Sequence, residues 1–309
     1  MRFIMQLQIV MSKPLLGTTY SSPHAEYLGL SQRAFDDLLD LHFNYIRIGT
    51  YWDRIEKKEG VYDFSEVKKL IEKSESAHQK VILTVGMKGP RWPEFHIPLW
   101  VKRKSEEELT IATMQYLEKS IKEFKNYSCI SHWQVENEPL GPSGPHNRKI
   151  SLDVLKQEVE LVQSLDNRPV ISTIWGNELS SRGFLPKISK ISDIIGIDLY
   201  YDQFIKNPFK RHSYSPPKDS QEKLKKIFST LEKPIWITEL QAEPWEASMN
   251  VYKSNNPPSM NAEKLLRNYK YALELNPEAI LFWGYEYWYY KKMSGDMRMW
   301  ETIQGIINH

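Results

Sequence analysis

Two carboxylate side chains stand where two short apolar segments of this 309-residue chain end. Glu138 belongs to WQVENEP, which ends at Pro139, and Glu239 follows the apolar run Ile235–Thr238. Both runs are expected to be buried strands that lead into loops. Two carboxyl groups can break a glycosidic bond, one by protonating the leaving oxygen and the other by facing the sugar carbon. This chemistry requires a fold that brings the two strand ends together.

Apolar segments rich in β-branched residues alternate with amphipathic segments along the whole chain. The predicted strands are Leu15–Tyr20, Tyr45–Thr50, Lys80–Gly86, Ile130–Val135, Pro169–Ile174, Ile194–Tyr200, Pro234–Thr238 and Ala279–Gly284. The predicted helices are Ser31–Leu41, Ser65–Ala77, Ser105–Lys125, Ser151–Leu165, Leu179–Ile188, Ser220–Leu231 and Ala262–Leu275. N-caps are predicted at Ser31, Ser65, Ser105, Ser151, Ser220 and Asn261.

The strands are apolar nearly throughout, which is typical of parallel sheets that are buried on both faces. Strands of this kind separated by helices predict an α/β fold, a (β/α)8 TIM barrel that residues 1–309 form as a single domain. An open doubly wound sheet is the alternative. It usually has a glycine-rich phosphate turn after its first strand, and GTTYSSPH is no such turn.

Long irregular segments follow four of the predicted strands, at 87–104, 136–150, 202–219 and 241–261. In a barrel of this kind all four emerge at the carboxyl ends of the strands, where barrel enzymes keep their active sites. Loops of this length are uncommon in a compact domain unless they are functional. We therefore expect the active site at this face.

Composition excludes several classes of partner. The net charge is only +2 and no block of basic residues is present, so neither nucleic acid nor a membrane is an expected partner. The N-terminal MRFIMQLQIVM lacks the cleavage site of a signal peptide, and the single Cys129 suits a reducing compartment, so a cytoplasmic protein is predicted. The 8 histidines show no metal-ligand spacing, so neither a metal site nor a cofactor is expected.

The residues at the ends of the fourth and seventh predicted strands resemble those of a known superfamily of enzymes. A fourth strand that ends in Asn-Glu-Pro and a seventh that ends in Thr-Glu resemble the clan A superfamily of retaining glycoside hydrolases, which are (β/α)8 barrels. By strand order the similarity spans essentially the whole chain, although the motifs are local. The resemblance implies that Glu138 is the acid/base, that Glu239 is the nucleophile and that Asn137 binds the sugar 2-hydroxyl.

Three further positions fit the same pattern. Arg47, in NYIRIG on the second strand, resembles the arginine that holds the nucleophile's carboxylate. Tyr200, in GIDLYYD, resembles the tyrosine that donates to the nucleophile, and the neighbouring Tyr201 is the other choice. Trp283, in LFWGYE, resembles the aromatic platform beneath the sugar, although a core tryptophan is an even alternative.

Two tryptophans are expected beside the cleft. Trp52, in YWDRIEKKEGVYDF, resembles a residue that organises the loop after the second strand, and Trp92, in GPRWPEF, is expected in the cleft wall or packed beneath it. Glu136 ranks below Glu138 as a catalyst because it lies further from the strand end. Asp198 stands where some families of the clan carry a histidine on the sixth strand.

These features predict a glycoside hydrolase that cleaves β-linked O-glycosidic bonds with retention, acting on an oligosaccharide or a glycoside. The motifs do not select the sugar. One alternative is a catalytically inactive carbohydrate-binding TIM-barrel protein. Another is a barrel enzyme of a different class, such as a metal-dependent hydrolase or an aldolase. That class needs His/Asp clusters or a strand-end lysine, and Lys88 is the nearest approach to one.

Overall fold

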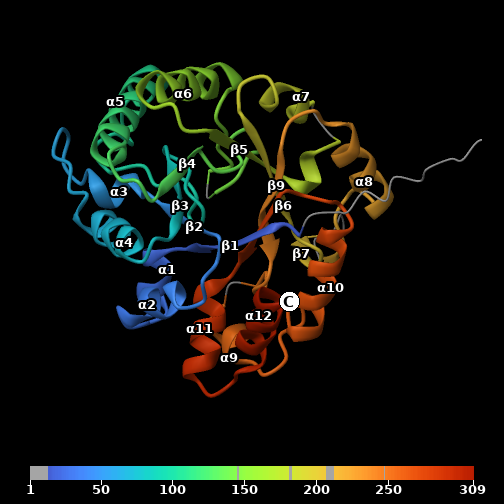
Figure 1. Ribbon diagram of the computed structural model, residues 1–309. Helices are drawn as coiled ribbons and strands as arrows, with labels where there is room; N and C mark the ends of the chain where they lie inside the picture. Colours follow the sequence, from blue (N-terminus) through green and yellow to red (C-terminus); the bar gives the residue numbers. More distant parts are fainter. Residues whose placement is uncertain (1–12, 145, 181–182, 207–211, 247) are drawn as a thin grey trace, which may run out of the picture.

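The structure is a computed structural model that describes residues 13–144, 146–180, 183–206, 212–246 and 248–309. Eight parallel strands form a closed barrel in the order β1-β10-β9-β6-β5-β4-β3-β2, and helices surround it (Figure 1). The predicted (β/α)8 TIM barrel is therefore confirmed. The N-terminal segment, for which no signal peptide is predicted, lies outside the described residues.

All eight barrel strands coincide with predicted strands, and their ends differ from the predictions by a few residues. They are β1 (Leu15–Tyr20), β2 (Tyr45–Gly49), β3 (Lys80–Val85), β4 (Ile130–Val135), β5 (Val170–Trp175), β6 (Ile194–Leu199), β9 (Ile235–Gln241) and β10 (Ala279–Trp283). The largest difference is in β9, which continues three residues beyond Thr238. Glu239 therefore lies inside a strand, whereas the sequence pattern placed it at the strand's end.

The seven predicted helices are present with shorter bounds. They are α2 (Arg33–Leu39), α4 (Ser65–Ser76), α5 (Glu106–Phe124), α6 (Leu152–Leu165), α7 (Phe184–Ile188), α8 (Gln221–Thr230) and α10 (Ala262–Leu273). Four predicted caps are confirmed, because the side chains of Ser105, Ser151, Ser220 and Asn261 each accept a backbone N–H. The caps predicted at Ser31 and Ser65 are wrong, since Gln32 and Phe64 hold those positions without a side-chain bond.

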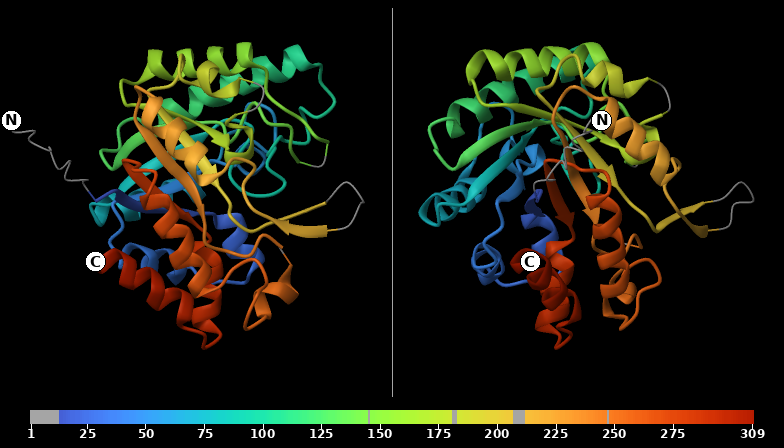
Figure 2. Two further views of the ribbon diagram at one scale, coloured as in Figure 1. Left: turned by 90° about the vertical axis from the view of Figure 1, so that its right-hand side faces the viewer. Right: turned by 45° about the vertical axis from the view of Figure 1, so that its right-hand side comes forward.

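The loops contain elements that the sequence pattern did not indicate. They are α1 (Ser22–Tyr27), α3 (Trp52–Ile55), η1 (Gly176–Glu178), the hairpin of β7 (Gln203–Lys206) and β8 (His212–Ser215), α9 (Met249–Lys253), α11 (Tyr285–Met293) and α12 (Arg298–Asn308). The hairpin extends away from the barrel in both views of Figure 2. No helix in the described part of the chain is long and apolar enough to cross a membrane.

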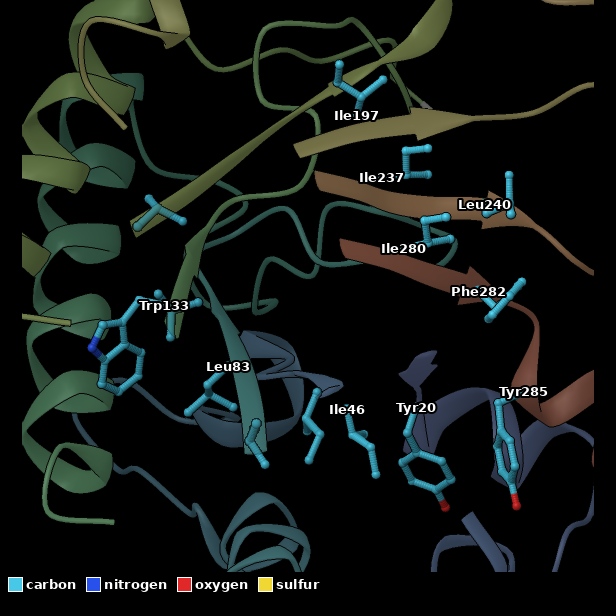
Figure 3. Packing of buried hydrophobic residues seen from close by; sticks show 14 of the residues in the cluster. Tyr20, Ile46, Leu83, Trp133, Ile197, Ile237, Leu240, Ile280, Phe282 and Tyr285 are labelled. Atoms are coloured by element: carbon cyan, nitrogen blue, oxygen red, sulfur yellow. The ribbon is translucent and has the colours of Figure 1, made fainter. Parts of the chain in front are cut away.

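Two layers of apolar packing hold the barrel. The larger lies between the strands and the surrounding helices, where Ile46, Leu83 and Trp133 pack in Figure 3. The smaller fills the barrel interior near the amino ends of the strands, where the rings of Tyr45 and Trp236 meet 5.0 Å apart across the barrel. Because side chains alternate along a strand, the residues two positions further on point into the same interior nearer the carboxyl ends.

Candidate active site

Arg47 occupies the centre of the polar end of the barrel. Its side chain is fully buried on β2, and its Nη2 atom donates to Oε1 of Glu239 at 2.6 Å. Nε donates to Oγ1 of Thr19 at 2.9 Å, and Nη1 donates to Oε1 of Gln134 at 3.2 Å. Nη1 also reaches Oδ1 of Asn137 at 3.4 Å. All three guanidinium nitrogens therefore have partners, which fixes the guanidinium beside the carboxylate.

A β-bulge on β9 turns Glu239 into the barrel. Ile237 and Glu239 pair with the consecutive residues Ile197 and Asp198 of β6, so β9 contains one extra residue. The pairing with β10 shifts in the same place. Bulges of this kind re-aim a side chain. As a result the consecutive Thr238 and Glu239 both point into the barrel. Thr238 donates to Asp198 at 2.6 Å, and Glu239 accepts from Arg47.

Of the two neighbouring tyrosines, Tyr200 is the one that contacts Glu239. The hydroxyl of Tyr200 donates to Oε2 of Glu239, so each oxygen of this carboxylate has one donor. Burial raises the pKa of Tyr200 well above its usual value, and the negative charge of Glu239 adds to this. The hydroxyl therefore keeps its proton. Tyr201 points elsewhere, with its ring 5.4 Å from that of Tyr271.

Glu138 lies three residues beyond the end of β4, in the loop into which the strand leads. Its backbone has a left-handed φ of 45°, a conformation that is costly for a residue with a side chain. Two bonds hold it there: its N–H donates to Oγ1 of Thr173 at 2.7 Å, and Nζ of Lys88 donates to its carbonyl oxygen at 2.6 Å. Lys88 is itself fully buried. The carboxyl group of Glu138 is left to line the cavity.

The surroundings of Glu138 favour its protonated form. Burial raises its pKa well above the usual value, and the nearby carboxylates of Asp198 and Glu239 raise it further. Lys88 opposes this shift without cancelling it. Asp198 is completely buried, and burial with the charge of Glu239 raises its pKa too. Glu138 and Glu239 thus face one cavity in different environments. The carboxyl group of Glu138 lies near two other carboxyl groups, whereas the carboxylate of Glu239 accepts from Arg47 and Tyr200.

Glu136 belongs to the support beneath the site and does not line the cavity. Its carboxylate accepts the backbone N–H of Met87 at 2.8 Å and that of Lys88 at 2.5 Å, tying β4 to the loop after β3. Burial raises its pKa to about 8, and the carboxyl of Glu158 on α6 lies next to it. Gly86 allows this approach, since a Cβ there would lie 2.2 Å from Oε1 of Glu136. The lower rank of Glu136 agrees with this geometry.

A cavity of about 740 Å³ opens at this end of the barrel. This volume lies in the range of small-molecule sites, roughly 300–1,000 Å³. Glu138, Glu239, Asn137, Tyr200 and Trp283 all line it. Trp92 lines its rim and is 70% exposed, which favours the cleft over packing for this residue.

Trp52 is placed elsewhere, and the expectation that it lies beside the cleft is corrected. It is fully buried, its ring stacks on Tyr116 at 5.2 Å, and its Nε1 atom donates to Glu56 at 2.7 Å. The apolar surroundings between β2 and α5 account for this position. Nothing in the sequence pattern around Trp52 indicates the side on which this aromatic residue packs.

Several residues around the site were not predicted. Thr19, Gln134 and Thr173 are polar residues within predicted strands, and this is the one signal that could have identified them. Asp198 gives the same signal in GIDLYY. Within the described residues, no group of three or more His, Cys, Asp or Glu side chains is arranged to hold a metal ion.

Comparison with known proteins gives matches of structure alone. No protein-family model matches the chain, and no curated protein matches it in sequence. A GH5_18 protein from Bifidobacterium longum subsp. longum, solved with Manb1-4GlcNAc, has a TM-score of 0.66 at 10% identity over 96% of this chain and 78% of its own. Xylanase 10B from Thermotoga maritima has a TM-score of 0.59 at 16% identity over 95% of both chains.

A third match shows a difference in size. The β-galactosidase from the haloarchaeon Halorubrum lacusprofundi has a TM-score of 0.59 at 12% identity, and the match covers 86% of this chain but only 52% of that one. These similarities establish that the chain has the barrel fold found in clan A glycoside hydrolases.

Proposed function

We propose that this protein is a retaining glycoside hydrolase that cleaves β-linked O-glycosidic bonds. The observation that carries the proposal is the contrast between two carboxyl groups in one cavity. Arg47 and Tyr200 donate to the two oxygens of Glu239, which suits an ionised nucleophile. Glu138 is held in its protonated form by burial and by neighbouring carboxylates, which suits a general acid.

In the first step the carboxylate of Glu239 attacks the anomeric carbon of the sugar. The bond to the leaving oxygen breaks, its electron pair stays on that oxygen, and Glu138 supplies the proton. Asn137 lines the cavity beside Glu138 and is positioned by Gln134, whose Nε2 donates to its Oδ1 at 3.0 Å. Its amide N–H₂ is therefore directed away from that bond, available to a sugar hydroxyl.

In the second step a water molecule attacks the anomeric carbon. Glu138, now a carboxylate, takes the proton of this water, and the bond between the sugar and Glu239 breaks. Two inversions at the same carbon give net retention, and both glutamates return to their starting states. Trp283, at the end of β10, offers an aromatic face to the sugar ring in this cavity. The structural neighbours include a xylanase and a β-galactosidase, which supports this class of reaction.

The test uses a panel of aryl β-glycosides with Glu239→Gln, Glu138→Gln and the exposed-surface control Glu107→Gln. Glu239→Gln should abolish turnover, and Glu138→Gln should lower it by at least about 100-fold, within the usual range of general acid catalysis. Proton NMR of early product should show the β-anomer first. Wild-type turnover in both cavity variants, or the α-anomer appearing first, would contradict the mechanism. Sugar binding without hydrolysis would support an inactive carbohydrate-binding protein.

A further inference from the structure

One part of the cavity is not used by the two-glutamate reaction. It lies next to Trp283, between α1 and α9, and His24, Tyr27, Arg91, Glu243 and Tyr252 line it. The guanidinium carbon of Arg91 stands 4.1 Å from the centre of the Trp283 ring. This region therefore adjoins the place where the reacting sugar would stack on Trp283.

Glu243 is fixed on one side by a buried ionic network. Its Oε1 atom accepts from Nη1 of Arg91, and Nη2 of Arg91 donates to Oε2 of Glu286 at 2.6 Å. Oε1 of Glu286 in turn accepts the backbone N–H of Ser21 at 2.6 Å. These bonds join the loops after β1, β3 and β9 to α11. The carboxylate of Glu243 is consequently held in one orientation before any ligand arrives.

The second carboxylate oxygen of Glu243, Oε2, is not part of this ionic network. The residue is only 6% exposed, and no described residue donates to its Oε2 atom with hydrogen-bond geometry, although the hydroxyl of Tyr252 lies close to this carboxylate. A buried carboxylate oxygen without a donor is costly and calls for an explanation. Because Glu243 lines the cavity, a donor group on a bound ligand can complete its hydrogen bonds.

The charges around Glu243 select the kind of ligand. Arg91 is shared between two carboxyl groups, so it has no excess positive charge to offer to an anion. His24 is neutral as well, because burial together with the charge of Arg91 lowers its pKa to about 2. Near the rim, Tyr27 and Trp92 are 63% and 70% exposed, and they offer apolar faces for stacking.

We propose that Glu243 determines specificity in a second sugar subsite beside Trp283, where its free oxygen accepts from a hydroxyl or amino group of a neutral or amino sugar and disfavours uronic acids. The proposal rests on the proposed glycosidase function. It places the substrate among oligosaccharides with at least two sugars on this side of the bond that is cleaved.

The test compares Glu243→Gln with wild type on 4-nitrophenyl β-glycosides of single sugars and of the matching β-1,4-linked disaccharides. Gln keeps the size of the side chain and removes its charge. We expect kcat/KM for the disaccharide substrates to fall about 10- to 100-fold, the effect of losing a hydrogen bond to a charged group. For the monosaccharide substrates kcat/KM should fall by a clearly smaller factor, so the ratio of the disaccharide value to the monosaccharide value should drop in the variant. The matched control is Glu246→Gln in the same loop, whose carboxylate accepts from Ser259 and does not line the cavity.

Binding separates this proposal from the hydrolase proposal. Isothermal titration of the Glu138→Gln protein with neutral, amino-bearing and uronic acid oligosaccharides reports on the subsite whether or not the wild type hydrolyses them. Neutral or amino-bearing ligands should bind more tightly than uronic acids, and adding Glu243→Gln should reduce the difference. The comparison of neutral with amino-bearing ligands shows which donor is preferred. Equal loss of kcat/KM on short and long substrates, or tighter binding of uronic acids, would overturn the proposal.

Discussion

Nη2 of Arg47 lies 2.6 Å from Oε1 of Glu239, and the two side chains are 0% and 4% exposed. The pair joins β2 to β9 across the barrel, although 192 positions separate the residues in the chain. A buried ion pair of this kind contributes little net stability, but removing one partner leaves an uncompensated buried charge. Its value here is geometric, since it fixes the carboxylate that the proposed mechanism uses.

Replacing Arg47 tests this relationship. Arg47→Met should lower the free energy of unfolding by about 3–5 kcal/mol and abolish turnover, because the carboxylate loses its charged partner. Urea denaturation followed by circular dichroism measures the first effect, and aryl glycoside turnover measures the second. Arg47→Lys keeps the charge but cannot reach Thr19, Gln134 and Glu239 together, so its activity should lie between those of the methionine variant and wild type. Full activity in the methionine variant would show that the pair is not needed.

Tyr200 and Tyr201 provide a matched pair of substitutions. Tyr200→Phe removes the hydroxyl that donates to Oε2 of Glu239, so kcat should fall about 10- to 100-fold, the equivalent of a hydrogen bond to a charged group. Tyr201→Phe removes the hydroxyl of the neighbouring residue, which donates to Gln221 outside the site, and its kcat should change less than about twofold. Steady-state kinetics on one aryl glycoside decides between them, and equal effects in both variants would refute the assignment.

Asp198 should set the basic limb of the pH profile. Its carboxylate raises the pKa of Glu138, so Asp198→Asn should lower that pKa. The general acid must be protonated to act, and the basic limb of kcat/KM reports its loss of the proton. The limb should therefore move to lower pH in the variant. Asp202→Asn is the control, since Asp202 pairs with Lys264 and Arg267 away from the cavity and should leave the limb in place.

The Glu136–Glu158 pair predicts how stability depends on pH. Burial raises the pKa of Glu136 to about 8 and that of Glu158 well above its usual value. Between about pH 4.5 and 8 the folded state therefore binds more protons than the unfolded state, and stability falls as pH rises through this window. Glu158→Gln removes one of these groups. Its free energy of unfolding, measured in urea at pH 5 to 8, should exceed that of wild type by about 1–2 kcal/mol at pH 8, with a smaller difference at pH 5. A pH-independent difference would contradict this account.

The sequence was a good guide to the barrel and to the ends of its strands, because continuous apolar runs and capping residues are local signals. Arg47, Glu138, Glu239 and Trp283 could be suggested because each stands out within or just after such a run. The tyrosine next to Glu239 could not be chosen from the alternation, since the choice depends on how β6 ends. Trp52 was misplaced for a similar reason, as an aromatic residue in a loop fits a cleft wall and a core equally well.

Other parts of the site depend on contacts between distant segments. The unusual backbone of Glu138 is held by Thr173 and Lys88, which lie on other strands or loops. The burial of Glu243 depends on Arg91 and Glu286, which lie in a different loop and on α11. Such partners become visible only when the barrel brings its loops together.

The extra residue in β9 has a consequence for alignment. Strand periodicity alone would place residues 238 and 239 on opposite faces, so a gap-free superposition on a regular strand would match Thr238 or Glu239 to the wrong column. Any profile built for relatives of this chain should allow one insertion between Ile237 and Glu239. A variant that deletes Thr238 would test the same point in the protein itself, because it would remove the bulge and make Ile237 and Glu239 consecutive residues of a regular strand, with Glu239 still paired with Asp198.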